Sequence, residues 1–135
     1  MVTIQMNYEG DLHCKAVHGP SGRELATDAP VDNQGRGESF SPTDLVATAL
    51  GTCMLTTMGI LARTLGVDIS GSTAAVEKEM TTTGPRKIQG LRVKIHVPRN
   101  QNPETREKLE RAARTCPVQR SLHPEVESPV EFIWG

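Results

Sequence analysis

The sequence predicts an α+β domain, and three patterns in it support that prediction. Segments in which apolar and polar residues alternate, typical of half-buried strands, occur near both ends and in the middle of the chain. A long uncharged segment follows a helix-start signal at residue 41, and a shorter amphipathic helical segment precedes the last alternating one. The expected order is β-β-β-α-β-β-α-β, in a single domain over residues 1–135.

Three strands are expected before the first helix. Alternation over residues 2–8, turn residues at 9–11 and renewed alternation over residues 12–17 predict a hairpin. A third strand is predicted near residues 24–27. The polar, glycine-bearing segment 32–39 then reads as a loop.

The first helix has a strong start signal. Ser41 can cap it, Pro42 suits its first position, and Asp44 follows the cap by three residues. The 18 residues from Leu45 to Ala62 carry no charge, but four threonines and two glycines lower their hydrophobicity. We therefore expect a buried central helix rather than a membrane span. Ala47 and Gly51 make part of one face small, so we expect another helix to cross there.

The remaining elements are two strands, a helix and a last strand. Strands are predicted over residues 73–82 and 91–97, and Asn102-Pro103 starts the second helix with a cap and a first-turn proline. One face of that helix is expected to be solvent-exposed and carries three acid-base pairs at i,i+4 spacing. Its other face is an apolar stripe whose last residue is Cys116. Pro117 is expected to break or restart it, and residues 130–134 alternate as the last strand.

Composition narrows the classes of function. With 15 basic against 16 acidic residues and four aromatics, the chain lacks the charge and the stacking side chains for nucleic acid. Leu, Ile, Val and Phe number 29 of 135, a thin core that favours a homodimer. The N-terminus lacks a signal-peptide pattern, and three unpaired cysteines favour the cytoplasm.

Two cysteines are candidates for redox chemistry. Cys53 on the central helix and Cys116 on the apolar stripe of the second helix would meet if the two helices pack together. Such a pair can form a disulfide. An inert, buried Cys53 is equally compatible with the sequence. Activation of Cys53 would need a cation from another part of the chain, and Arg36, held by Glu38, is the candidate. The alternative is that Arg36 and Glu38 form a solvated pair in their loop.

The other cysteines and motifs are interpreted more simply. A helix starting at Pro117 would place Cys116 at its positive end, which predicts that Cys116 is the easier thiolate. Cys14 shares a strand face with Ala16, and packing is its expected role. No spacing typical of a metal site, a phosphate-binding loop or a serine nucleophile occurs, so no cofactor is expected.

Two segments resemble the OsmC/Ohr family: the one from Phe40 to Cys53, which opens Phe-Ser-Pro-Thr-Asp, and Thr115-Cys116-Pro117-Val118. The resemblance covers nearly the whole chain. Thr43 and Asp44 stand where the best-studied branches carry a glutamate, so the chain resembles the OsmC-like relatives more than typical Ohr. The resemblance implies antiparallel sheets wrapped around a buried central helix, in an intertwined homodimer with an active site at each interface.

The resemblance also implies a reaction. Cys53 would attack an organic or small hydroperoxide and become a sulfenic acid, which Cys116 would convert to a disulfide. A dithiol, of lipoyl type in the Ohr branch, would be the reductant. Two other functions stay open: a dimer that binds a small hydrophobic ligand with idle cysteines, and a redox sensor that forms the disulfide slowly. No nucleic-acid or membrane partner is expected.

Overall fold

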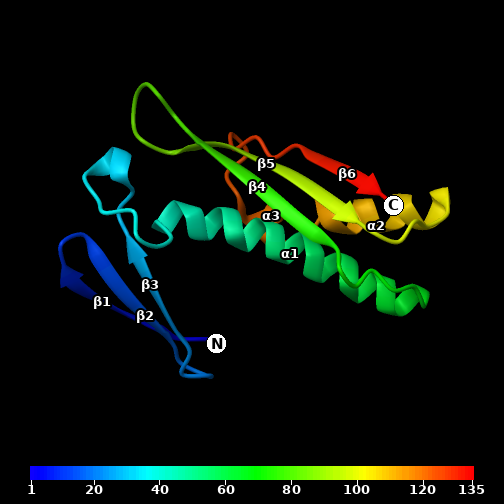
Figure 1. Cartoon of the computed structure of the whole chain (residues 1–135), viewed down its shortest axis with the longest axis horizontal. Coiled ribbons are helices and arrows are strands. Elements are labelled where there is room, and N and C mark those ends of the chain that lie inside the picture. The colour runs from blue at the N-terminus through cyan, green and yellow to red at the C-terminus, as the bar shows by residue number, and fades with distance from the viewer. The chain divides into compact units, whose positions relative to one another are not determined.

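The computed structural model describes residues 1–135 and divides them into two compact units, Met1–Val46 and Ala47–Gly135 (Figure 1). We call them the N-terminal unit and the C-terminal unit. The predicted order of strands and helices is confirmed. The short helices η1 (Val31–Asn33) and α3 (Pro117–Ser121) are additional, and α3 shows that Pro117 restarts a helix. The single-domain prediction stays a prediction.

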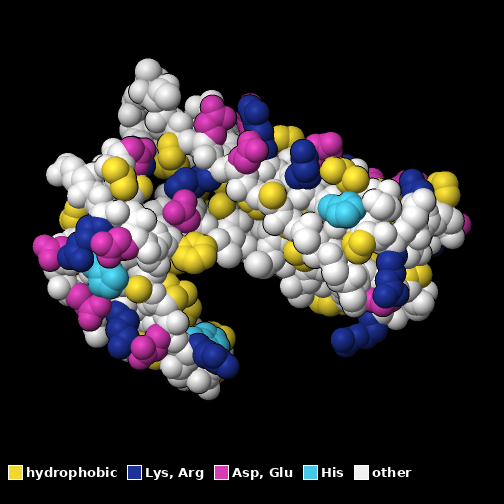
Figure 2. All heavy atoms as spheres, viewed as in Figure 1, with side chains coloured by type: hydrophobic (Ala, Val, Ile, Leu, Met, Phe, Trp, Pro, Cys, Tyr) yellow, Lys and Arg dark blue, Asp and Glu magenta, His cyan; other side chains and the backbone are white.

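The N-terminal unit is built on an antiparallel sheet of three strands. Its order is β1 (Ile4–Gly10), β2 (His13–His18) and β3 (Glu24–Asp28), with Tyr8 opposite Cys14 and Cys14 opposite Thr27. Directly opposed residues point to the same face of a sheet, so one face is apolar. The large side chains of this face stay exposed: Ile4, Met6, Tyr8 and Leu25. Figure 2 shows hydrophobic side chains among the charged ones at this sheet.

Helix α1 (Pro42–Leu65) begins with the predicted capping box. The Asp44 amide donates to Ser41 Oγ at 3.1 Å, and the Ser41 amide donates to Asp44 Oδ2 at 2.9 Å. By length and composition α1 could cross a membrane, with a mean hydropathy of 1.8 over 18 residues. A single helix of this kind is weak evidence for a span, because core helices of soluble proteins meet the same criteria.

The expectation that α1 is buried on all sides is wrong for this chain. Its buried positions form one face, and a row of residues spaced four apart is exposed on another: Thr48, Thr52, Thr56 and Ile60. The expected helix crossing at Gly51 is wrong as well. A Cβ built there would lie 3.0 Å from Val76 Cγ2 and 3.7 Å from Ala74 Cβ, so a strand packs closely against this point.

The C-terminal unit contains a second sheet, ordered β4 (Thr73–Met80), β5 (Ile88–Val97) and β6 (Val130–Trp134). Strands β4 and β5 pair antiparallel, as expected. Strand β6 departs from the expected antiparallel arrangement and pairs parallel with β5, with Phe132 beside Ile95. The chain reaches it through α2 (Pro103–Arg114) and α3, a crossover of the length that a parallel connection needs.

The core of the C-terminal unit lies between this sheet and the helices α1 and α2. The predicted buried face of β5 is confirmed, with Leu91, Val93, Ile95 and Val97 at most 3% exposed. The predicted ion pairs on the outer face of α2 are confirmed too, with N–O distances from 2.8 to 3.7 Å: Glu104–Lys108, Glu107–Arg111 and Glu110–Arg114. Residues from distant parts of the sequence therefore meet in one core, and the second predicted cysteine is among them.

Candidate site at a pair of thiols

The fold brings Cys53 and Cys116 together. Cys53 lies on α1 beside the fully buried Met54, and Cys116 follows α2 as the N-cap of α3. The Cys53 side chain lies near enough to that of Cys116 to contribute to the raised pKa of Cys116. Both cysteines are free thiols in this structure. The expectation that the two thiols meet is therefore confirmed, whereas their roles stay a prediction.

The prediction that Cys116 is the easier thiolate is wrong. The backbone N–H of Gln119 donates to Cys116 Sγ at 3.4 Å, which is the helix-end interaction expected to favour the thiolate. Burial outweighs it, because Cys116 is fully enclosed and a charged sulfur would lose its hydration. The net effect is a raised pKa of Cys116, caused first by burial and further increased by Cys53.

The two thiols also differ in exposure. Cys53 is partly exposed, whereas no surface of Cys116 is accessible. Burial raises the pKa of Cys116 and Cys53 raises it further, so the surroundings favour the protonated form of Cys116. A reagent from solvent can therefore reach Cys53 first.

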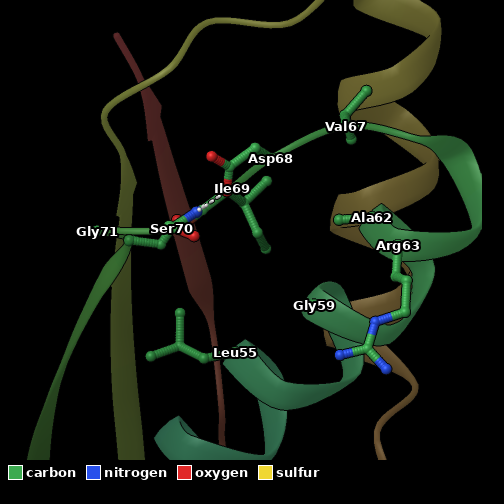
Figure 3. A pocket seen from close by; sticks show the side chains of 10 residues that line it. Leu55, Gly59, Ala62, Arg63, Val67, Asp68, Ile69, Ser70 and Gly71 are labelled. Atoms are coloured by element: carbon green, nitrogen blue, oxygen red, sulfur yellow. Dashed lines mark hydrogen bonds between the residues drawn. The ribbon is translucent and has the colours of Figure 1, made fainter.

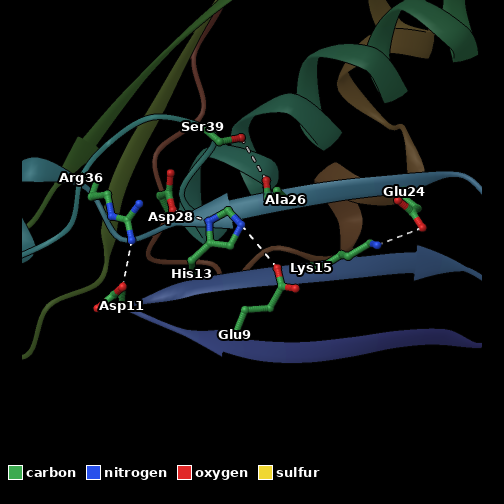
Figure 4. A network of polar contacts seen from close by, with 9 residues as sticks. All are labelled: Glu9, Asp11, His13, Lys15, Glu24, Ala26, Asp28, Arg36 and Ser39. Atoms are coloured by element: carbon green, nitrogen blue, oxygen red, sulfur yellow. Dashed lines mark hydrogen bonds and ion pairs between the residues drawn. The ribbon is translucent and has the colours of Figure 1, made fainter.

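The predicted pairing of Arg36 with Glu38 is wrong. Figure 4 shows Arg36 beside Asp11 of the β1–β2 turn, and its Nη2 donates to Asp11 Oδ2 at 3.0 Å. Glu38 lies nearby in sequence but is exposed. Gly35 explains part of this loop conformation: a Cβ there would lie 1.7 Å from the carbonyl oxygen of Ala29, so the loop packs tightly against backbone.

The same unit contains a buried carboxylate that the sequence did not signal. Asp28 is 2% exposed and lies opposite His13 across β2 and β3. Its Oδ1 lies 2.6 Å from Nδ1 of His13, and Glu9 lies 3.5 Å from the other ring nitrogen (Figure 4). The pair connects two strands at the end of the sheet.

No group of three or more His, Cys, Asp or Glu side chains is placed to hold a metal ion.

Gln119 is the residue near the thiols that sequence reasoning missed. Besides its backbone contact with Cys116, its side-chain Nε2 donates to Ser128 Oγ at 2.8 Å. Its Oε1 is buried and has no hydrogen-bond partner. The sequence around Gln119 gives no signal that this residue contacts a thiol. Its place three residues after Cys116 was the one available hint.

A pocket of about 520 Å³ lies elsewhere in the C-terminal unit, at the C-terminal end of α1 (Figure 3). Apolar side chains form much of its wall, among them Leu55, Val67 and Ile69, and Arg63 and Asp68 add charge. The carboxylate of Asp68 is already engaged, since it accepts from the Ser70 amide at 2.8 Å and pairs with Arg99. Neither Cys53 nor Cys116 lines this pocket, so it is separate from the thiol pair.

A family profile described as OsmC-like protein matches residues 35–131, a segment that includes both thiols. The comparison with curated proteins finds no match.

Solved structures share the fold over nearly the full length. A Psychrobacter arcticus protein, provisionally described as an osmotic-stress-induced and detoxification-response protein, is 45% identical, with a TM-score of 0.93 over 98% of this chain and 96% of that one. The organic hydroperoxide resistance protein OsmC of Legionella pneumophila is 15% identical (TM-score 0.79; 98% and 96% covered). An organic hydroperoxide resistance protein of Elizabethkingia anophelis, with thiocyanate bound, is 14% identical (TM-score 0.79; 100% and 98% covered).

Proposed function

This chain belongs to the OsmC-like protein family, and from that premise we propose that it is a cysteine-dependent peroxidase acting on organic or small hydroperoxides. The observation that carries the proposal is that Cys53 and Cys116 are free thiols close enough for Cys53 to raise the pKa of Cys116. Two structures with the same fold belong to organic hydroperoxide resistance proteins, which supports the choice of substrate. Cys53 is the attacking thiol because it is the more accessible of the two.

The first step transfers one oxygen. The Cys53 thiolate attacks the outer oxygen of the hydroperoxide, the O–O bond breaks, and the alkoxide takes a proton and leaves as an alcohol. The hydroxyl stays on sulfur as a sulfenic acid. Sulfur is oxidised by two electrons and the peroxide is reduced by two, so the step balances without a cofactor.

The second step uses Cys116. Its sulfur attacks the sulfenic sulfur of Cys53, its proton joins the departing hydroxyl, and water leaves as the disulfide forms. The raised pKa of Cys116 fits this role, because a protonated thiol brings the proton that the leaving group needs. A dithiol then reduces the disulfide by exchange and returns both thiols. A reducing cytoplasm would supply such a reductant.

Activation of Cys53 needs a cation, and Arg36 stays our candidate. Its present pair with Asp11 is exposed on both sides, at 53% and 82%, and exposed ion pairs contribute little, roughly 0–1 kcal/mol. The guanidinium can therefore leave Asp11 at small cost. Glu38 is not needed to hold it.

We also propose a homodimer. The apolar face of the N-terminal sheet and the row from Thr48 to Ile60 on α1 are both exposed in the single chain. The hydroxyls of Thr52 and Thr56 have hydrogen-bond partners without water, because each donates to a carbonyl of its own helix at 2.8 Å. Methyl groups are then left for packing, and a second copy would cover both surfaces.

Stopped-flow oxidation of the reduced protein by cumene hydroperoxide and by hydrogen peroxide tests the function. We expect fast oxidation, with mass spectrometry showing loss of two hydrogens and a Cys53–Cys116 linkage. Cys53→Ser should abolish turnover. Cys116→Ser should still consume one equivalent and stop at the sulfenic acid, and Cys14→Ser serves as the matched control with wild-type rates.

Other outcomes point elsewhere. Oxidation no faster than that of a free thiol, together with an apolar molecule that copurifies, would favour a ligand-binding dimer. Slow formation of the disulfide, with a protein partner bound to the oxidised form alone, would favour a redox sensor. Full turnover by Cys53→Ser would exclude the proposed peroxidase.

A further inference from the structure

The amide oxygen of Gln119 is a buried acceptor without a donor. Buried polar groups in proteins are nearly always hydrogen-bonded, and an exception calls for an explanation. This oxygen belongs to a residue whose backbone N–H donates to Cys116 Sγ at 3.4 Å. The unpaired acceptor is therefore part of the same turn as the resolving thiol.

The orientation of the amide follows from its other half. Nε2 of Gln119 donates to Ser128 Oγ at 2.8 Å, in the segment that leads into β6. Because the amide is planar, this bond also sets the direction of Oε1. The backbone bond to Cys116 anchors the same residue at its other end. The acceptor is thus held in place before any oxidation occurs.

We propose that Gln119 is a positioning residue for the resolving step, and that its Oε1 accepts a hydrogen bond from the hydroxyl of the sulfenic acid on Cys53. The proposal rests on the proposed peroxidase. A sulfenic acid on Cys53 would bring a hydroxyl donor that the reduced thiol does not have. The backbone N–H of Gln119 donates to Cys116 Sγ, and Cys53 is near enough to raise the pKa of Cys116, so both residues are neighbours of Cys116.

The hydrogen bond would orient the reacting groups. When the sulfenic O–H points to Gln119, a lone pair of its oxygen can face the S–H of Cys116. As the two sulfurs bond, the Cys116 proton passes to that oxygen, and the hydroxyl leaves as water. The sulfenic sulfur is reduced by one electron and the Cys116 sulfur is oxidised by one, so the step balances. Gln119 gains and loses no proton.

The test separates the two steps. Full-length wild type and Gln119→Met, which keeps the length of the side chain but has no amide, are mixed with cumene hydroperoxide. Sulfenic acid is trapped with dimedone, and the disulfide is followed by mass spectrometry. We expect unchanged formation of the sulfenic acid and a disulfide step about three- to tenfold slower, as for one lost hydrogen bond. Ser128→Ala, which keeps the acceptor but frees the amide, should slow the same step less.

Gln89→Met on the exposed side of β5 is the matched control and should leave both rates unchanged. A disulfide step at the wild-type rate in Gln119→Met would overturn the inference while leaving the peroxidase intact. Equal slowing of both steps would also overturn it, because it would show a general structural defect. If wild-type protein forms no sulfenic acid at all, the proposed function itself fails, and this inference fails with it.

Discussion

At the scale of single residues, the two thiols are made different by their surroundings. Cys116 combines a position at a helix N-terminus, which favours a thiolate, with complete burial, which opposes it. Burial dominates because a buried charge loses its hydration, whereas a five-residue helix has a short row of dipoles. As a result, Cys116 favours its protonated form and lies near the more exposed Cys53.

The raised pKa of Cys116 gives a first prediction. In a Cys53→Ala, Cys14→Ala background, burial still acts on Cys116, so its reaction with methyl methanethiosulfonate should show an apparent pKa above the usual value of about 8.5. Rates measured from pH 6 to 11 check this. An apparent pKa below the usual value would mean that the helix end prevails over burial.

The same shift predicts a pH dependence of stability. Because the pKa of Cys116 is higher in the folded state, its contribution to folding is complete below the pKa of the unfolded thiol. It is lost as the pH rises from there through the folded-state pKa. Reduced wild type should therefore lose more stability in urea between about pH 8 and 11 than Cys116→Ala does. Parallel curves for the two proteins would contradict this.

The sequence predicted the cysteine pair but not the rest of the site. Cys53 and Cys116 were found because both lie on helical stripes, and periodicity reports which positions are buried. The partner of Arg36 was wrong, because nearness in a loop does not determine where a long side chain reaches. Gln119 was missed, because an unsatisfied acceptor depends on the geometry of an amide that local sequence does not encode.

At the scale of elements, α1 contains two glycines in different surroundings. A Cβ at Gly51 would meet Val76 at 3.0 Å, whereas a Cβ at Gly59 would meet nothing within 4 Å. Gly59→Ala should therefore stabilise the protein by up to about 1 kcal/mol, and Gly51→Ala should gain less or lose stability. Urea unfolding of both variants measures the difference. A larger gain at Gly51 would show that β4 does not pack against it.

The capping box of α1 is a second feature at this scale. Ser41→Ala removes the acceptor of the Asp44 amide and should cost about 1 kcal/mol, within a range of roughly 0.5–2. Thermal unfolding should show the loss. The rate of thiol oxidation per folded molecule should not change, because Ser41 lies three helical turns before Cys53. A fall in that rate would connect the cap with the site.

Element types were predictable from periodicity, whereas the orientation of β6 was not. Alternation in residues 130–134 shows a strand with one buried face, and it is the same in a parallel and an antiparallel pair. The direction is determined by the crossover through α2 and α3. The burial of α1 was overestimated for a related reason: threonines that bond to their own helix look apolar in sequence and can remain exposed in one chain.

At the scale of the whole molecule, the distribution of core residues is uneven. All buried hydrophobic side chains lie between Ala47 and Cys116, and none belongs to the N-terminal unit. An apolar sheet face that stays exposed to water is typical of a surface that another element or chain covers. The N-terminal unit therefore has more to gain from a second copy than the C-terminal unit, which has its own core.

The proposed dimer predicts a specific effect at Ile60, which is 65% exposed on α1. Ile60→Asp places a charge on the surface that a second copy would cover, so light scattering should show wild-type dimers and a shift toward monomers in the variant. Lys108→Asp, on the solvated face of α2, is the control and should remain dimeric. A monomeric wild type would exclude the dimer.

Trp134 is the single tryptophan of the chain, and its indole N–H donates to Glu110 of α2 at 2.9 Å. Intrinsic fluorescence excited at the tryptophan band therefore reports one local event, the docking of the last strand on α2. Cys116 follows that helix by two residues. We expect the proposed Cys53–Cys116 disulfide to shift the end of this helix, and the fluorescence of Trp134 would then report its formation.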